Sequence, residues 1–217
     1  MVVRPSGANP GEAVRQDEYL HMDESYYTVL EKGGKSSTGK ASCKVYIWAA
    51  LASHLRLVHF FYENGSRARK VLTQYIKPDY QGAIQTDGLG DYKILETDEY
   101  PHAVRLACFQ HCKRKFLDIK ENKDAAEIIE IINKLYQKEH EMPAGYISLS
   151  RRNSLFCGSH QGAKKAALIY SLACSCRMNN INTFEYFKEL LNKAVSLNPN
   201  TDKNVLRELL PDKWKKR

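Results

Sequence analysis

The sequence predicts a mixed α/β domain with one central sheet, followed by a basic helical segment at the C-terminal end. Three consecutive strand-like segments lie between residues 19 and 62, and helical and strand-like segments then alternate up to residue 142. This order is typical of a single sheet with helices packed against it. The chain has 217 residues, 43% of them hydrophobic and 27% charged, which is enough apolar material for a buried core.

The first three strands are predicted from composition and alternation. Residues 19–30 (YLHMDESYYTVL) and 44–52 (KVYIWAALA) are rich in aromatic and β-branched residues, and a glycine-containing loop separates them. Residues 55–62 (LRLVHFFY) alternate, with Leu55 and Phe61 on the same face. The Asn64-Gly65 pair then closes this strand. We expect the three strands to form an antiparallel meander.

Helices and two further strands follow. A helix is expected after a capping Ser66 and ends at Lys77-Pro78. Residues 82–87 form a short strand, and residues 103–108 form another that leads into a helix. Asp124 is expected to cap the next helix, whose apolar stripe comprises Ala125, Ile128, Ile129, Ile132 and Leu135.

The domain organisation follows from composition and charge. We expect a tail over residues 1–18, an α/β core over 19–142 and a basic helical segment over 146–217. Residues 1–142 carry 20 basic and 20 acidic residues, whereas residues 143–217 carry 13 basic and 5 acidic ones, which is the whole net charge of +8. This split indicates a surface that faces a polyanion such as nucleic acid, or alternatively a solvated lysine-rich face.

Several classes of protein are disfavoured. No apolar run is long enough to span a bilayer, and the N-terminal residues lack the apolar core of a secretion signal. Six cysteines without such a signal indicate reduced thiols, so we expect a cytoplasmic protein. The sequence contains no P-loop, dinucleotide-binding glycine pattern or Gly-x-Ser-x-Gly elbow. Cys108, His111 and Cys112 lack the second pair of ligands that a zinc site requires.

Two acidic residues occupy positions that suit a metal site. Asp23 lies inside the first strand, and Asp87 ends a short apolar strand directly before Gly88. Rigid strand ends commonly hold carboxylates that bind divalent cations and activate a water or hydroxyl against a phosphodiester. The alternatives are a solvent-facing acid on an edge strand for Asp23 and a turn-capping residue for Asp87.

Basic clusters provide candidate nucleic-acid contacts. His111 is followed at once by Lys113, Arg114 and Lys115, at a strand-to-helix junction where phosphate can be bound. A basic helix start would be unfavourable without a ligand, which favours a functional interpretation. Arg151, Arg152 and Asn153 precede a Gly/Ser loop that opens a helix.

Four of these strings together resemble transposases of the insertion sequence 66 family. They are LHMDES, IQTDGLGDY, ACFQHCKRKF and SRRNSLFCGSHQGAKKAALIYSLACSCRMNNIN, which occur in the order of the family. The resemblance implies a ribonuclease-H-like fold and an Asp-Asp-Glu site that cuts and joins double-stranded DNA at transposon ends with Mg²⁺ or Mn²⁺. It makes Asp23 and Asp87 the first two catalytic, metal-binding acids. His111, Lys113, Arg114 and Lys115 match the His-x-Arg-Arg-Lys-Phe stretch of the family.

The chain also departs from that family. The longer members carry N-terminal DNA-binding and zinc-binding segments, and an Asp-Asn-Asn-x-x-Glu string with the third acid precedes the segment that matches Arg151–Asn153. No Asp-Asn-Asn occurs here, which indicates an N-terminally truncated copy with an internal deletion near residues 143–145. Glu141 falls close to the expected count, although its neighbours match an earlier helix.

The function predicted from the sequence is therefore DNA transposition by a degenerate enzyme that binds its metal weakly. Transposases commonly act as homo-oligomers that bridge two DNA ends, but the sequence leaves the oligomeric state of this chain open. The alternative is a non-catalytic DNA-binding remnant. Whether this copy is an enzyme stays open at this point, because only two of the three acids are recognisable.

Overall fold

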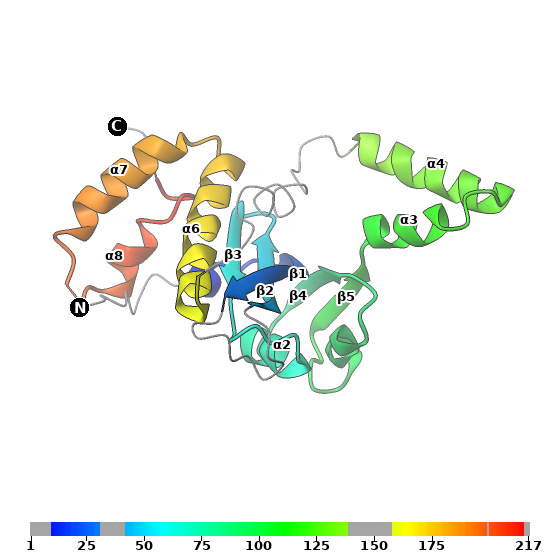
Figure 1. Cartoon of the computed structure of the whole chain (residues 1–217), viewed down its shortest axis with the longest axis horizontal. Helices are drawn as coiled ribbons and strands as arrows, with labels where there is room; N and C mark the ends of the chain where they lie inside the picture. Colours follow the sequence, from blue (N-terminus) through cyan, green and yellow to red (C-terminus); the bar gives the residue numbers. More distant parts are fainter. Residues whose placement is uncertain (1–9, 31–41, 139–157, 199, 215–217) are drawn as a thin grey trace.

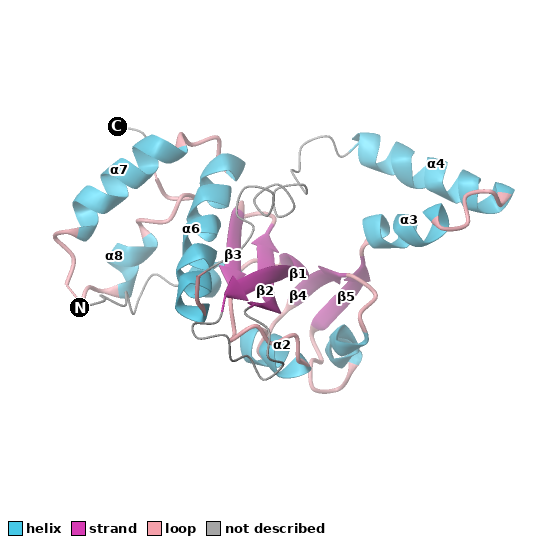
Figure 2. Cartoon of the chain, in the orientation of Figure 1, coloured by secondary structure: helices cyan, strands magenta, loops and turns pink. Residues whose placement is uncertain are grey.

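The computed structural model describes residues 10–30, 42–138, 158–198 and 200–214. A five-stranded sheet lies at its centre, in the order β3-β2-β1-β4-β5, with helices on both faces (Figures 1 and 2). The mixed α/β class that the sequence predicts is confirmed. The strands are β1 (Tyr19–Leu30), β2 (Ser42–Ala52), β3 (Leu57–Phe61), β4 (Gly82–Thr86) and β5 (Ala103–Ala107). The helices are α1 (Pro10–Val14), α2 (Arg69–Tyr75), α3 (Phe109–Leu117), α4 (Lys123–Lys138), α6 (His160–Met178), α7 (Thr183–Ala194), α8 (Lys203–Arg207) and the 3₁₀ helix η1 (Gly90–Glu96).

The first three strands form the expected antiparallel meander. β1 pairs with β2 along nearly its whole length, and β2 pairs with β3 over the five residues of β3. The turn after β3 uses Asn64 and Gly65, which both have positive φ angles. A Cβ on Gly65 would lie 2.5 Å from Val45 Cγ1, so this position requires glycine.

β4 and β5 complete the sheet on the other side of β1. β4 runs parallel to β1 and pairs with it over only three residues, Tyr19 to His21 opposite Ala83 to Gln85. β5 runs parallel to β4 along its full length. The sheet is therefore mixed, with β1 in the middle.

Each face of the sheet covers its own apolar core. Residues of β1 and β2 such as Met22 and Trp48 pack with α1 and α2, while Val29 and Ile47 face the opposite side and pack with α6. The alternation in β1 and β2 thus sends neighbouring residues into different cores.

Residues 10–18 are part of the fold, so the expected tail over 1–18 is too long. Pro10–Val14 form α1, and Val14 is fully buried in the core. Asp17 is buried as well, and its carboxylate accepts hydrogen bonds from the amides of Tyr19 and Leu55. These bonds join the chain before β1 to the turn before β3.

Two predicted helix caps are wrong by a few residues. The N-cap of α2 is Ala68, and Ser66, two residues before it, accepts a hydrogen bond at its Oγ from the Ala68 amide. At α4, Asn122 rather than Asp124 accepts hydrogen bonds from the first free amides. Both errors arise because several adjacent polar residues can each cap a helix.

The described part of the C-terminal segment packs against the central sheet through α6. α6 packs on β3 through a line of small residues at four-residue spacing, namely Ala163, Ala167, Ser171 and Ser175. These small side chains let the helix approach the strand closely. Ser171 Oγ accepts a hydrogen bond from the Phe60 amide at 2.7 Å, and Ser175 Oγ accepts one from the Val58 amide at 2.9 Å. α6 therefore satisfies backbone groups of an edge strand.

Within the described residues, no helix combines the length and the apolar character that crossing a bilayer requires.

The buried histidine of β3 leads to a prediction about pH. His59 stacks on Phe61 and Tyr75, and burial, with a smaller contribution from Arg15, lowers its pKa from 6.5 to about 3. Below about pH 6.5 the unfolded chain binds a proton at His59, whereas the folded chain does not. Protonation therefore favours the unfolded chain, so the folded chain has its full stability above that pH and loses stability as the pH falls. We expect the free energy of unfolding to drop by about 2 kcal/mol between pH 7 and pH 5.

Urea unfolding at a series of pH values measures this slope. His59→Phe keeps the aromatic stack and removes the titrating group, so its unfolding free energy is expected to vary less over the same range. Equal slopes for the two proteins would assign the pH dependence to other groups.

Candidate metal centre

Asp23 lies in the middle strand, at the point where β1 extends past β4. The ladder with β4 ends at His21, and β1 continues to Leu30 paired with β2 alone. Asp23 is half-buried, and its Oδ1 accepts a hydrogen bond from the Glu24 amide at 2.9 Å. The alternative of a solvent-facing acid on an edge strand is therefore wrong, because β1 is central.

Asp87 follows directly after β4. The register that sets His21 opposite Gln85, continued by two residues, brings Asp87 beside Asp23. Its backbone carbonyl accepts a hydrogen bond from Arg105 Nη2 at 2.8 Å, and its Oδ1 accepts one from the Leu89 amide at 2.9 Å. One carboxylate oxygen thus caps the turn, as the alternative interpretation expects, and this contact also fixes the orientation of the carboxylate.

His111 joins the two aspartates from the first turn of α3. One potential ligand atom from each of Asp23, Asp87 and His111 lies within 4.8 Å of the other two, and all three side chains are half-buried. The Nδ1 atom of His111 is buried and has no hydrogen-bond partner among the described residues. The structure therefore brings together two residues expected to bind metal and one expected to contact DNA.

The electrostatics of the cluster suit a cation. Burial raises the pKa of Asp23, the charge of a nearby His111 opposes that rise, and the Glu24 and Asp87 carboxylates add to it. A bound cation would favour the ionised carboxylate, because its positive charge compensates for the hydration that the carboxylate loses on burial.

Three residues that support the site were not identified from the sequence. Glu24 is on the opposite face of β1 from Asp23, and its side chain is 1% exposed. It pairs with Arg67 at 2.5 Å and accepts a hydrogen bond from the Tyr92 hydroxyl at 2.8 Å. A second acid directly after Asp23 in a predicted strand is a signal for such a pair, but neither partner can be identified from spacing alone.

Arg105 is the third of these supporting residues. Its Nε donates to Thr86 Oγ1 at 2.9 Å and its Nη1 donates to Glu96 at 2.6 Å, in addition to the contact with the Asp87 carbonyl. Arg105 thus ties the end of β4 to β5 and η1, which holds the backbone that carries Asp87.

The basic residues after His111 lie further along α3 than expected. α3 begins at Phe109, so Arg114 and Lys115 fall in its last turn, where cations interact favourably with the helix dipole. The argument from an unfavourable basic helix start is therefore wrong. Lys113 Nζ donates to Asn133 Oδ1 on α4 at 2.5 Å, while Arg114 and Lys115 are exposed.

The structure leaves some of the residues singled out in the sequence outside the site. Arg151, Arg152 and Asn153 lie outside the described residues, as does Glu141. The described cysteines at 43, 108, 112, 174 and 176 form no disulfide with one another, and none of them belongs to a group of three potential metal ligands among the described residues.

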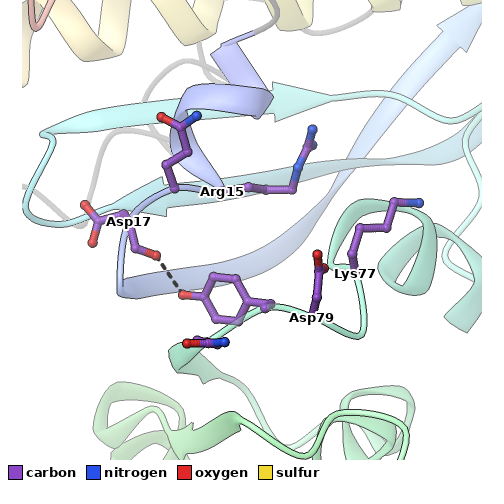
Figure 3. Close-up of a pocket in the computed structure, with 7 residues that line it drawn as sticks. Arg15, Asp17, Lys77 and Asp79 are labelled. Atoms are coloured by element: carbon purple, nitrogen blue, oxygen red, sulfur yellow. Dashed lines mark hydrogen bonds between the residues drawn. The ribbon is translucent and has the colours of Figure 1, made fainter.

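A separate pocket of about 310 Å³ lies at the other end of the parallel strands (Figure 3). Arg15, Asp17, Lys77 and Asp79 line it, together with the loop before β4, and the Tyr80 hydroxyl donates to the Asp17 carbonyl at 2.9 Å. Because this pocket is at the amino ends of β1 and β4, it is distinct from the Asp23–Asp87–His111 cluster.

Comparison with known proteins identifies the family. The model of the Transposase IS66 family matches residues 4–145, about two thirds of the chain. The chain belongs to this family. The matched range contains Asp23, Asp87 and His111, so the cluster lies within the transposase region. The resemblance noted from the sequence motifs is confirmed at the level of the family.

Two similar proteins come from Sinorhizobium fredii (strain NBRC 101917 / NGR234). The uncharacterized protein y4jD is 22% identical over 239 residues, which cover 73% of this chain and 46% of y4jD. The uncharacterized protein y4hP is 36% identical over 70 residues, or 32% of this chain and 12% of y4hP. The chain thus spans less than half of either relative. The first alignment is longer than this IS66 chain itself. It therefore contains gaps at which y4jD has residues and this chain has none.

The buried pair behind the site leads to a stability prediction. Replacing Arg67 with Met leaves the Glu24 carboxylate buried without its cation. We expect a loss of about 2–4 kcal/mol in the free energy of unfolding, slightly below the range for fully buried pairs because the Arg67 side chain is 38% exposed.

Arg69→Met is the matched control. Arg69 is 55% exposed and lies 3.6 Å from Asp91, so its loss is expected to cost less than about 1 kcal/mol. Denaturant unfolding of the two variants tests the difference, and equal effects would show that Glu24 does not depend on Arg67.

Proposed function

We propose that this chain carries the metal-dependent core of a DDE transposase, which cuts and joins DNA, in a copy whose catalytic activity is degenerate. The observation that carries this proposal is the meeting of Asp23 and Asp87 at the end of the β1–β4 ladder, inside the region that matches the transposase family. The strand order β3-β2-β1-β4-β5, with β2 antiparallel and β4 parallel to β1, supports a ribonuclease-H-like fold.

The residues of the chain have distinct roles in this proposal. Asp23 and Asp87 hold the divalent cation, which is Mg²⁺ or Mn²⁺ in the intact family. A cation at such a site polarises a phosphate oxygen and activates the attacking water or hydroxyl. Arg105 keeps Asp87 in place through its backbone, and the Arg67–Glu24 pair stabilises the strand beneath Asp23.

Double-stranded DNA at transposon ends is the proposed partner, and exposed cations support this. Arg114 and Lys115 are exposed on α3, and Lys164 and Lys165 are exposed near the start of α6. Together with the net charge of +8, these residues favour contact with a phosphate backbone. Assembly into a homo-oligomer and a cytoplasmic location belong to the same proposal.

Four observations support degeneracy of this copy. The Asp-Asn-Asn-x-x-Glu string expected from the family is absent from the sequence, and the alignment with y4jD opens gaps in the chain. The family match ends at residue 145, where the sequence suggests an internal deletion. In addition, large apolar side chains on β5, α3 and α4 are exposed, including Val104, Phe109 and Ile131. Such exposure is expected if a packing segment has been lost.

DNA binding is the first test of the proposal. We expect the chain to bind a linear duplex, with an affinity that falls as salt rises. Replacing both Lys164 and Lys165 with Gln is expected to reduce the slope of log K against log salt by up to about 1.8, since each lost phosphate contact accounts for about 0.9.

Arg114→Gln/Lys115→Gln, measured alongside, reports the contribution of α3. Substitutions are preferable to deletion of residues 146–217, because α6 is packed on β3. Absence of duplex binding even at low salt would contradict a role in transposition.

Nicking of supercoiled plasmid DNA with Mn²⁺ tests the catalytic part. We expect no cleavage above the background given by Asp23→Asn, because the third acid is missing. The informative comparison is between the wild type and Glu141→Gln. Robust cleavage by the wild type that is lost in both variants would show that Glu141 restores the site and that this copy is an active enzyme.

A further inference from the structure

The third member of the cluster is a histidine, and its position suggests a role other than DNA contact. We propose that His111 is a direct ligand of the cation held by Asp23 and Asp87, which gives an Asp-Asp-His donor set that prefers Mn²⁺ to Mg²⁺. This inference rests on the proposed function only in requiring that the two aspartates bind a divalent cation.

The geometry of the cluster fits a single ion. Ligand atoms that each lie about 2.1 Å from one ion are at most about 4.2 Å apart. The atoms offered by Asp23, Asp87 and His111 lie within 4.8 Å of one another without any ion. Movements of a few tenths of an ångström in three half-buried side chains are enough to close the site.

The surroundings of His111 also point to a ligand. Its Nδ1 atom is buried without a hydrogen-bond partner among the described residues. Leaving a buried polar atom unpaired costs about 1–3 kcal/mol, so such atoms are rare unless a ligand or water completes them. His111 is on the first turn of α3, and the amide of Cys108, just before that helix, donates to the Thr86 carbonyl. The start of α3 is therefore tied to the residue before Asp87.

The two aspartates lack other partners of opposite charge. In the described part of the chain, no lysine or arginine forms an ion pair with Asp23 or Asp87. Two arginines near the site are paired with other acids, Arg67 with Glu24 and Arg105 with Glu96. The positive charge that this pair of carboxylates requires is thus left to a cation near His111.

A nitrogen ligand changes which ion fits best. Mg²⁺ prefers oxygen ligands and keeps much of its water, whereas imidazole nitrogen binds first-row transition metals more readily. An Asp-Asp-His set is therefore expected to bind Mn²⁺ more tightly than Mg²⁺, by a larger margin than two carboxylates alone.

Mn²⁺ binding to the whole chain, followed by electron paramagnetic resonance, tests the inference without any need for catalysis. Pulsed measurements detect a nitrogen nucleus bound to Mn²⁺ directly. We expect a nitrogen coupling in the wild type that disappears in His111→Ala, together with roughly a tenfold or greater loss of Mn²⁺ affinity and a smaller loss of Mg²⁺ affinity.

Two further variants sharpen the comparison. His102→Ala removes an exposed histidine just before β5 and is expected to keep both the nitrogen coupling and the affinity. His111→Asp restores an all-oxygen donor set and is expected to shift the preference back towards Mg²⁺. Thermal melts of each variant check that the fold is retained.

The outcomes separate the two proposals. Mn²⁺ binding that depends on Asp23 but is unchanged in His111→Ala, with no nitrogen coupling, would overturn the role of His111 and leave the two-aspartate site standing. A wild-type chain that binds no Mn²⁺, like Asp23→Asn, would overturn both the ligand role and the proposed metal-dependent function.

Discussion

Three residue pairs join β1 to β4, and the positions of both site carboxylates follow from that short parallel ladder. Side chains alternate between the faces of a strand, so the register decides which face each residue occupies. With His21 opposite Gln85, Asp23 and Asp87 fall on the same face, and a slip of one residue would separate them. Arg105 adds to this constraint, because it ties the Asp87 carbonyl and Thr86 to the neighbouring strand β5.

Two adjacent acids in the middle strand have different environments because they face opposite sides of the sheet. Glu24 enters the core with α1 and α2, where Arg67 and the Tyr92 hydroxyl neutralise and bind it. Asp23 faces the other side, where burial raises its pKa and the described residues provide no salt bridge. Glu24 thus forms a structural ion pair with Arg67, whereas the Asp23 carboxylate remains available to bind a cation. This division depends on the strand remaining in one register.

The sequence predicted the parts of the fold that depend on local pattern. The meander, β4 and β5 were found because alternation and glycine turns mark them directly. The pairing of Asp23 with Asp87 was expected from their strand positions and the family motifs. The Arg67–Glu24 pair and the proximity of His111 to the aspartates were not, because these residues are distant in the sequence and are brought together by tertiary packing. A helix after the Gly/Ser loop was predicted, but α6 contacts β3 mainly through alanines and serines, which hydropathy does not mark as a packing face.

Helices cover one face of the sheet only in part, and this bears on the proposed degeneracy of this copy. On the face that carries Asp23, α6 covers β3 and its neighbours, whereas Val104 and Leu106 of β5 point to the same face and are 57% and 39% exposed. Figure 1 shows α3 and α4 projecting beyond β5, away from α6. α4 shares this exposure, since Ile131 and Leu135 are about half exposed. An apolar surface of this kind is normally covered in a stable domain. The gaps in the alignment with y4jD indicate that a longer relative has additional residues within the matched region. A segment packed on this face would lie next to Asp23 and Asp87, so the internal deletion that we propose would remove covering for the core and a ligand for the site together.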